Sequence, residues 1–236
     1  MKNKRLVYVS FTFPHHKGTH AGYQHIGEHI HYDIVVDCES FFSRCMKKRI
    51  SLWSRALARC IRYLFGYPVF PLHIIKCIYL GIRYNDLIFH FIHPENTYVN
   101  FKCYIRKGNK IVLTIHQPYE WYDNRLWLNR LRSANLIISL SDRELPKFQL
   151  QIGLNNIKYI PHGIDVSFYK PTTLQKDPIV LTVGNWLRDY EFADKVYQKL
   201  KELNEKVRIV VVSLPNNKKY ISQMSRIDFV SGIPDE

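Results

Sequence analysis

The sequence lacks the features that mark a secreted or membrane-spanning chain. Its five cysteines are an odd number without a Cys-x-x-Cys pair, which indicates neither a disulfide framework nor the usual zinc spacing. It has no uninterrupted run of about 20 apolar residues, the length that a helix needs to cross a bilayer. The start, MKNKRLVYVSFTFP, has a short apolar stretch without a small-residue cleavage site and predicts a first strand instead of a signal peptide. These absences favour a cytoplasmic chain.

Acidic residues are scarce. Asp and Glu number 20 against 34 Lys and Arg, which gives a formal net charge of +14. Such an imbalance indicates an anionic partner, which could be a phosphorylated substrate, an anionic lipid or a nucleic acid. No known nucleic-acid-binding motif accompanies the charge, so nucleic acid is not the expected partner.

The positive charge is concentrated in residues 40–85, which contain no Asp or Glu. Apolar residues recur at helical spacing over residues 52–65, whereas Arg55, Arg59 and Arg62 fall on another face. A helix of this kind can lie on an anionic membrane, with its arginines on the headgroups and Trp53 at the acyl boundary. The alternative is an ordinary surface helix whose apolar face packs on the sheet and whose arginines are solvated.

Short apolar runs rich in β-forming residues predict strands, and stretches of helical length separate several of them. Apolar residues at consecutive positions are typical of strands that are covered on both faces. We therefore expect an α/β fold with a doubly wound parallel sheet. The predicted strands are residues 6–9, 34–36, 87–92, 111–115, 136–140 and 157–160.

The pattern restarts after a polar segment bounded by Pro171 and Pro178. About 60 residues remain, which is short for a doubly wound domain of roughly 100 to 150 residues. The elements expected there are a strand, a helix and two further strands, at residues 179–183, 190–204, 208–213 and 227–230. The predicted organisation is an N-terminal domain over 1–170, a linker over 171–178 and an incomplete C-terminal domain over 179–236.

A loop with two glycines follows the first predicted strand. Gly18 and Gly22 would let the backbone approach a ligand closely, and the helix start behind them offers N–H groups to phosphate or hydroxyl oxygens. The alternative is that these glycines only satisfy a turn.

Several segments, in their order along the chain, resemble glycosyltransferase family 4. They are GTHAGY, KIVLTIHQPYEWY, ANLIISLSDRELPKF, IKYIPHGIDVSFYKP and PIVLTVGNWLRDYEF. Members of that family have the GT-B fold of two facing Rossmann-like domains, so the resemblance implies an acceptor-side domain followed by a nucleotide-sugar-binding domain. It places Gly18, Gly22 and Tyr23 near the acceptor and the donor phosphates, and the imidazole of His116 near the transferred sugar. The alternative for His116 is a structural histidine at a strand end.

The start of the second domain departs from the family. Gly184 is followed by Asn185 where the family usually has Arg, Tyr190 stands about where a Lys is expected, and Arg188 is the only cation of the loop. The resemblance implies that Gly184, Asn185 and Arg188 contact the donor diphosphate, with Arg188 supplying a bidentate pairing. The family's second glutamate-bearing motif does not occur before residue 236.

The resemblance implies a hexosyltransferase-like enzyme of cell-surface glycan synthesis. It would transfer a sugar from a nucleotide-sugar to a polysaccharide or lipid-linked acceptor, in the cytoplasm or peripherally on the inner face of the cell membrane. No metal or other cofactor is expected, because cations and helix termini neutralise the diphosphate in such enzymes. The competing interpretation is a non-catalytic truncated or split-gene fragment that binds acceptor, membrane or a partner chain. A sugar-nucleotide epimerase lacks support, since no GxGxxG follows the first strand.

Overall fold

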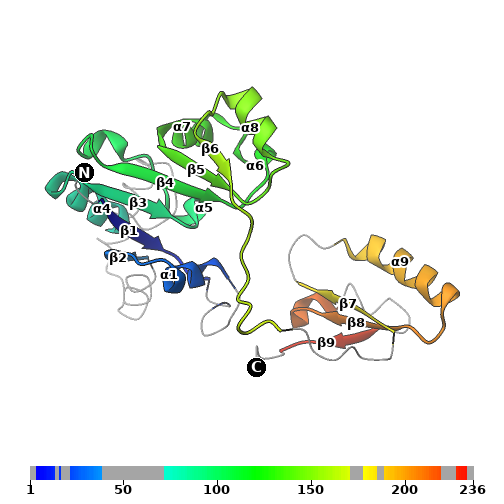
Figure 1. Ribbon diagram of the computed structural model, residues 1–236. Coiled ribbons are helices and arrows are strands. Elements are labelled where there is room, and N and C mark those ends of the chain that lie inside the picture. Colours follow the sequence, from blue (N-terminus) through cyan, green and yellow to red (C-terminus); the bar gives the residue numbers. More distant parts are fainter. Residues whose placement is uncertain are drawn as a thin grey trace, which may run out of the picture. The chain divides into compact units, whose positions relative to one another are not determined.

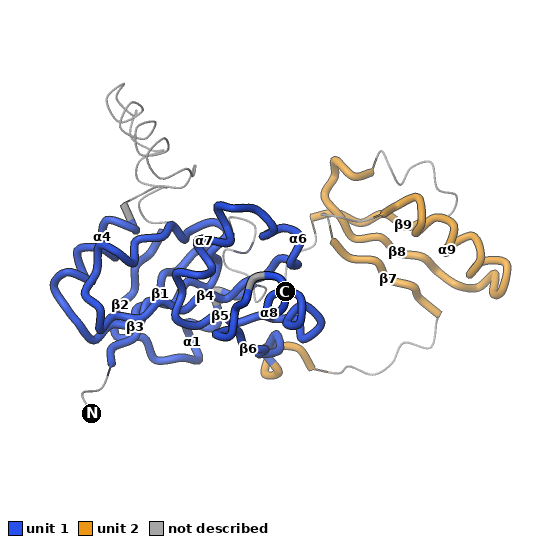
Figure 2. The backbone as a smooth tube through the Cα atoms, turned by 90° about the horizontal axis from the view of Figure 1, so that it is seen from above, with its two compact units in different colours: residues 1–165 blue, residues 166–236 orange. Residues whose placement is uncertain are grey.

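The computed structural model describes residues 4–13, 16, 22–38, 72–170, 178–184, 189–218 and 227–232. The chain divides into two compact units, Met1–Asp165 and Val166–Glu236 (Figure 2).

The first unit is built on a six-stranded sheet in which all neighbouring strands are parallel (Figure 1). The strand order is β2-β1-β3-β4-β5-β6, so the chain moves one way from β1 to β2 and then the opposite way from β3 to β6. This reversal confirms the doubly wound fold. The strands are β1 (Arg5–Ser10), β2 (Ile34–Asp37), β3 (Leu87–Phe91), β4 (Lys110–Ile115), β5 (Leu136–Ser139) and β6 (Ile157–Tyr159). Each lies within one residue of its predicted ends.

The core of this unit lies on the central strands. Phe89 and Phe91 of β3 and Ile111 and Leu113 of β4 have no exposed surface. Full burial of each such side chain contributes about 1.5–3 kcal/mol to stability. Strands with apolar residues at nearly every position gain most when both of their faces are covered. The apolar runs that predicted β3 and β4 therefore also favour their position in the middle of the sheet.

Helices and short turns connect these strands. Asn124 caps α7, because its side chain accepts a hydrogen bond from the Trp127 N–H at 3.0 Å. Gly153 ends α8 with a left-handed backbone at φ +66°. The helical elements are η2 (Tyr23–His25), α1 (Ile26–His29), α4 (Leu72–Arg83), α5 (Pro94–Thr97), η3 (Lys102–Tyr104), α6 (Tyr119–Tyr122), α7 (Arg125–Ser133) and α8 (Leu145–Ile152).

Replacing Gly81 of α4 with alanine is expected to destabilise the first unit. Alanine ordinarily favours a helix over glycine by about 1 kcal/mol. A Cβ at residue 81 would, however, meet Ile105 Cγ2 at 2.3 Å and Ile105 Cβ at 2.7 Å. Such overpacking costs about 1–3 kcal/mol, so we expect a net loss of about 1 kcal/mol in the free energy of unfolding.

Urea unfolding followed by tryptophan fluorescence measures this loss. The double variant Gly81→Ala/Ile105→Ala removes the closer contact, with Ile105 Cγ2, and keeps the one with Cβ. Measured against the single variant Ile105→Ala, which reports the cost of trimming Ile105, the Gly81→Ala change should therefore cost less than it does in the parent chain. A higher urea midpoint for Gly81→Ala alone would contradict the prediction.

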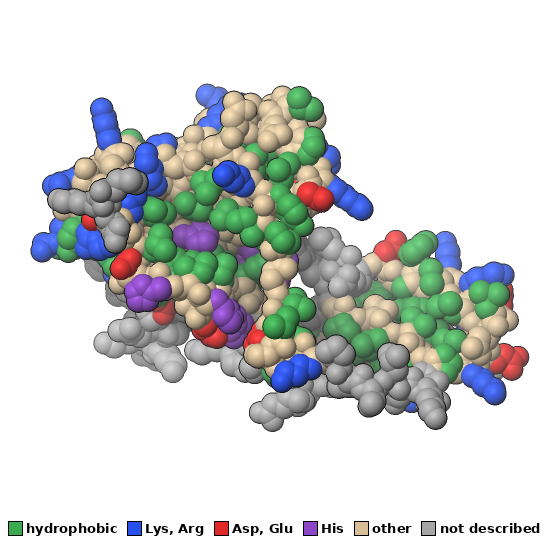
Figure 3. Space-filling view, in the orientation of Figure 1, with side chains coloured by type: hydrophobic (Ala, Val, Ile, Leu, Met, Phe, Trp, Pro, Cys, Tyr) green, Lys and Arg blue, Asp and Glu red, His purple; other side chains and the backbone are tan. Residues whose placement is uncertain are grey.

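The second unit has a three-stranded parallel sheet in the order β7-β8-β9. Its elements are β7 (Ile179–Val183), α9 (Tyr190–Leu203), β8 (Arg208–Val212), η4 (Pro215–Asn217) and β9 (Asp228–Val230), again within one residue of the predicted strands and helix. Tyr197 of α9 packs with Ile209 and Val211 of β8 in a small core. Leu181 and Val183 of β7 are 58% and 53% exposed, and apolar side chains gather over this sheet (Figure 3).

The predicted membrane-contact residues Trp53, Arg55, Arg59 and Arg62 lie outside the described residues, so membrane contact stays a prediction. In the part of the chain that the structure describes, no helix combines the length and apolar character needed to span a bilayer.

Candidate functional site

Imidazole and aromatic rings converge where β3 and β4 end. His93 follows β3, and His116 is the residue directly after β4. Both strands run parallel to β1, and the strand order reverses between β1 and β3. The carboxyl ends of strands at such a reversal are where doubly wound sheets bind ligands.

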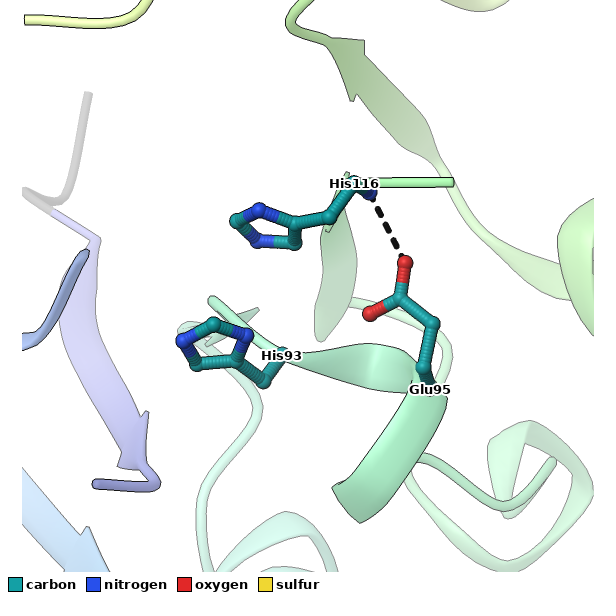
Figure 4. A group of neighbouring side chains, drawn as sticks. All are labelled: His93, Glu95 and His116. Carbon is teal, nitrogen blue, oxygen red and sulfur yellow. Dashed lines mark hydrogen bonds between the residues drawn. The ribbon is translucent and has the colours of Figure 1, made fainter. Parts of the chain in front are cut away.

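The rings are in direct contact. The His93 and His116 imidazoles stack, with centroids 4.5 Å apart and planes 20° from parallel (Figure 4). The Tyr23 ring meets His116 edge-on at 4.0 Å and His93 at 5.6 Å. It also lies 4.3 Å from the ring of His162, which follows β6. Four segments that are distant in the sequence therefore meet at one cluster.

Glu95 fixes the backbone beneath this cluster. Glu95 belongs to the short helix α5 after His93, and only 6% of its surface is exposed. One carboxyl oxygen, Oε1, accepts a hydrogen bond from the His116 backbone N–H at 2.8 Å (Figure 4) and another from the Tyr122 hydroxyl. Burial, together with the nearby Glu95, raises the pKa of Tyr122, so this phenol stays a hydrogen-bond donor. Glu95 therefore ties the ends of β3 and β4 to α6.

Both imidazoles are neutral at physiological pH. Burial lowers the pKa of His93 to about 3, and the neighbouring His116 and His16 add to the effect. Burial also lowers the pKa of His116, although Glu95 and the Ile92 carbonyl oppose the shift. The His116 Nε2 donates to that carbonyl oxygen, which leaves Nδ1 as an acceptor.

The cluster has the donor types of a metal site but not its geometry. One nitrogen of each imidazole and one Glu95 oxygen lie within 4.8 Å of one another. In-plane lone pairs of two nearly parallel, stacked rings point side by side instead of converging on one ion. A shared cation would require a ring to turn and the bond from His116 to the Ile92 carbonyl to break, so this arrangement does not fit a metal. That no metal is needed stays a prediction.

The structure brings together only some of the predicted residues of the first unit. Gly22 has a φ of +106°, which favours glycine, and it directly precedes Tyr23 of the cluster. Gly18 lies outside the described residues. The helix after this loop, α1, has only four residues. Of the described residues predicted in this loop, Tyr23 is the one whose ring contacts His116.

In the second unit, Gly184 follows β7 with a φ of +128°. Its carbonyl oxygen accepts hydrogen bonds from the Tyr190 hydroxyl at 3.3 Å and from Ser213 Oγ at 3.0 Å. Tyr190, which stands about where the resemblance leads one to expect a Lys, therefore braces the loop backbone. Asn185 and Arg188 fall in the part of the loop that the structure does not describe.

Sequence reasoning missed His93 and Glu95. A signal was present in the sequence. The segment Ile92-His93-Pro94 at the end of β3 resembles the segment Ile115-His116-Gln117-Pro118 at the end of β4. Two such strand ends in neighbouring positions of a parallel sheet would have predicted that the two imidazoles meet.

Comparisons with known protein families and with curated proteins find no match. Among solved structures the chain is similar to TarM, with a TM-score of 0.51 and 14% identity over 68% of this chain and 36% of that one. It is likewise similar to a mutant of S. aureus TarM in complex with fondaparinux, alpha-GlcNAc-glycerol and UDP, with a TM-score of 0.50 and 15% identity over 68% of this chain and 37% of that one.

This likeness concerns the fold. It agrees with the two parallel sheets and confirms the expected α/β class of GT-B type. The chain spans little more than a third of the length of either TarM structure. Membership of glycosyltransferase family 4 stays a prediction.

Proposed function

We propose that the chain is a glycosyltransferase, or the acceptor-side part of one, that transfers a sugar from a nucleotide-sugar to a glycan or lipid-linked acceptor. The observation that carries the proposal is the position of His116 at the carboxyl end of β4, beside the reversal of strand order. The shared GT-B type of fold supports it, as does the complex of the TarM mutant with UDP and alpha-GlcNAc-glycerol.

His116 has the properties that a sugar-contacting residue needs. Its backbone N–H is bonded to Glu95 and its Nε2 to the Ile92 carbonyl, so the ring cannot turn freely. Its Nδ1 can accept a hydrogen bond from a sugar hydroxyl. Because burial disfavours the imidazolium, His116 would orient the transferred sugar by neutral hydrogen bonding and not act as a charged acid.

The diphosphate needs a separate anion-binding group. We assign it to the loop of the second unit, where Gly184 adopts a positive φ after β7 and Asn185 and Arg188 follow. A bidentate guanidinium contact from Arg188 would stabilise the departing diphosphate without a metal. Gly18, Gly22 and Tyr23 would contact the acceptor and the phosphates, and the basic segment with Arg55, Arg59 and Arg62 would keep the protein on the inner face of the membrane.

A non-catalytic role is the second candidate. The donor-side loop has Asn185 where the family usually has Arg, and Tyr190 about where it has Lys. This departure favours a protein that binds acceptor, membrane or a partner chain without transferring a sugar itself.

A thermal-shift screen of UDP, GDP, dTDP and ADP, alone and as their sugars, tests the donor role. A ligand present at 100 times its Kd stabilises the folded state by about 2.7 kcal/mol, so the matching nucleotide should raise Tm by several degrees. We expect Arg188→Ala to remove this increment and Arg188→Lys to restore part of it, because lysine keeps the charge without the bidentate geometry.

Arg208→Ala is the matched control. Arg208 belongs to the same unit, is exposed and pairs with Asp228 at 2.9 Å, so its loss should leave the ligand increment unchanged. Absence of any increment across the panel would refute donor binding and leave the non-catalytic role.

A further inference from the structure

The outer face of α4 carries a stripe of exposed apolar side chains. Ile75, Tyr79 and Ile82 are 50%, 58% and 54% exposed. At about 3.6 residues per turn, their spacing of four and three residues places them in one line along the helix. The opposite face is buried in the core through Ile74 and Leu80. A helix that is apolar on both faces is normally covered on both, so the stripe indicates a binding surface.

Positive charge borders this stripe. α4 contains Lys76 and Arg83 and no Asp or Glu. Both cations are exposed, and each directly follows an isoleucine of the stripe. Because successive helix residues are about 100° apart, the two cations lie along the same border of the stripe. The outer face of α4 therefore combines an apolar line with a cationic edge.

The loop beside the end of α4 extends this surface. The Arg106 N–H donates to the carbonyl oxygen of Gly81 in α4 at 3.1 Å. Residues 102–107 carry three exposed cations and no acidic residue. They also include Tyr104, which is 53% exposed. The loop thus adds an aromatic ring and further positive charge next to the helix.

The charge balance of the region is positive. α4 and residues 102–107 together contain five Lys or Arg residues. The acidic residues on the neighbouring strands are Asp33 and Asp37 at β2, and Asp86 before β3, which pairs with Arg5 at 2.9 Å. Lys and Arg side chains lie on the side of the first unit that carries α4 (Figures 1 and 3). This balance favours an anionic partner.

We infer that the outer face of α4 rests on an anionic lipid bilayer, with the stripe at the acyl boundary and Lys76 and Arg83 on the headgroups. A helix with an apolar face and cationic flanks lies in the plane of such an interface. Tyrosine is enriched there, and each nearby cation strengthens binding to anionic lipid. A protein partner fits less well, because lysine is depleted in protein interfaces.

This surface is separate from the membrane contact predicted at Trp53, Arg55, Arg59 and Arg62. The bilayer contact of α4 does not depend on sugar transfer. A further step rests on the proposed function: because α4 belongs to the same unit as His116, contact with the bilayer favours a lipid-linked acceptor over a soluble glycan.

The first arm of the test removes apolar surface without changing charge. The full chain with Ile75→Gln/Ile82→Gln is compared with Leu126→Gln/Leu150→Gln, which alters exposed residues of α7 and α8 in the same unit. Co-sedimentation with vesicles of phosphatidylcholine and phosphatidylglycerol measures binding without nucleotide or sugar, so its failure is distinct from failure of the donor screen. We expect the α4 pair to weaken binding about tenfold or more, because two isoleucines no longer enter the bilayer, and the control pair to bind like the parent chain.

The second arm removes charge. Lys76→Gln/Arg83→Gln and the control pair Arg125→Gln/Arg132→Gln in α7 each lose two exposed cations. We expect the α4 pair to weaken binding to the same vesicles about tenfold or more, and the control pair to weaken it much less. The parent chain should bind neutral phosphatidylcholine vesicles more weakly, and about 1 M salt should reduce its binding to the anionic ones.

Several results would overturn the inference. They are failure of the parent chain to bind the anionic vesicles, equal binding to neutral vesicles, and equal binding by Ile75→Gln/Ile82→Gln and its control. A lower Tm of this variant with unchanged vesicle binding would show that the stripe packs within the chain. Dissociation of a parent dimer by the variant, again with unchanged vesicle binding, would assign the stripe to a second copy. Either of these outcomes also contradicts a bilayer contact.

Discussion

Acidification from pH 7 to pH 5 is expected to destabilise the first unit by on the order of 4 kcal/mol, through two histidines whose folded pKa lies below the unfolded value. Burial lowers the pKa of His90 to about 4 and that of His93 to about 3. In the unfolded chain both rings take up protons as the pH falls through about 6.5, whereas in the folded chain they do not until far lower pH. Stability is therefore complete above the unfolded pKa and is lost as the pH falls, by about 1.4 kcal/mol per pH unit for each group.

Urea unfolding at a series of pH values, followed by fluorescence of Trp121 and Trp127, measures this slope. The slope of the unfolding free energy against pH, in units of 2.303RT, equals the number of protons that the unfolded state binds in excess of the folded state. This number should approach about two between roughly pH 6 and pH 5. His93→Phe and His90→Phe should each remove about one proton from it. A stability that does not change on acidification would show that these rings are protonated in the fold.

Removing the Glu95 side chain has the second large effect. Glu95→Ala leaves the His116 N–H and the Tyr122 hydroxyl without this acceptor in a buried environment. Leaving a buried donor unsatisfied costs about 1–3 kcal/mol, so for these two donors we expect a loss of about 3 kcal/mol at neutral pH. The backbone at His116 would also lose its anchor, so sugar binding should weaken.

Glu95→Gln is the matched variant. Its amide oxygen can accept the same two hydrogen bonds without charge, so we expect a loss of about 1 kcal/mol. Tyr122→Phe tests the other end of the contact and should cost less than Glu95→Ala, because it removes one donor and leaves the His116 bond in place. Equal losses for Glu95→Ala and Glu95→Gln would show that charge, and not hydrogen bonding, is what Glu95 contributes.

The strands were predictable because local patterns determine them. Runs such as Leu87 to Phe91 contain apolar residues at nearly every position, and only a strand covered on both faces uses such a run. The family resemblance, which rests on short local segments, pointed to Gly184 and His116. These features depend on a few consecutive residues, which a single sequence displays.

The partners of His116 could not be predicted in the same way. Glu95 contacts His116 only because β3 and β4 are neighbours in the sheet, and Tyr23 reaches it only because β1 lies on the other side of β3. Burial of Glu95 was also unexpected, since carboxyl groups are mostly exposed. Tyr190 shows the reverse case. It stands about where the family has a cation, but its hydroxyl bonds the Gly184 carbonyl, a role that no spacing indicates.

The strand order also governs when the chain can fold during its synthesis. Arg5 of β1 pairs with Leu87 of β3, so β1 must wait for this neighbour until the whole stretch between them has been synthesised. At about 5–20 residues per second this wait lasts on the order of ten seconds. Of the described strands, only the short edge strand β2 can pair with β1 in that interval, and an exposed apolar strand invites pairing with other chains. Chaperone protection of β1 during that interval would therefore raise the yield of folded protein.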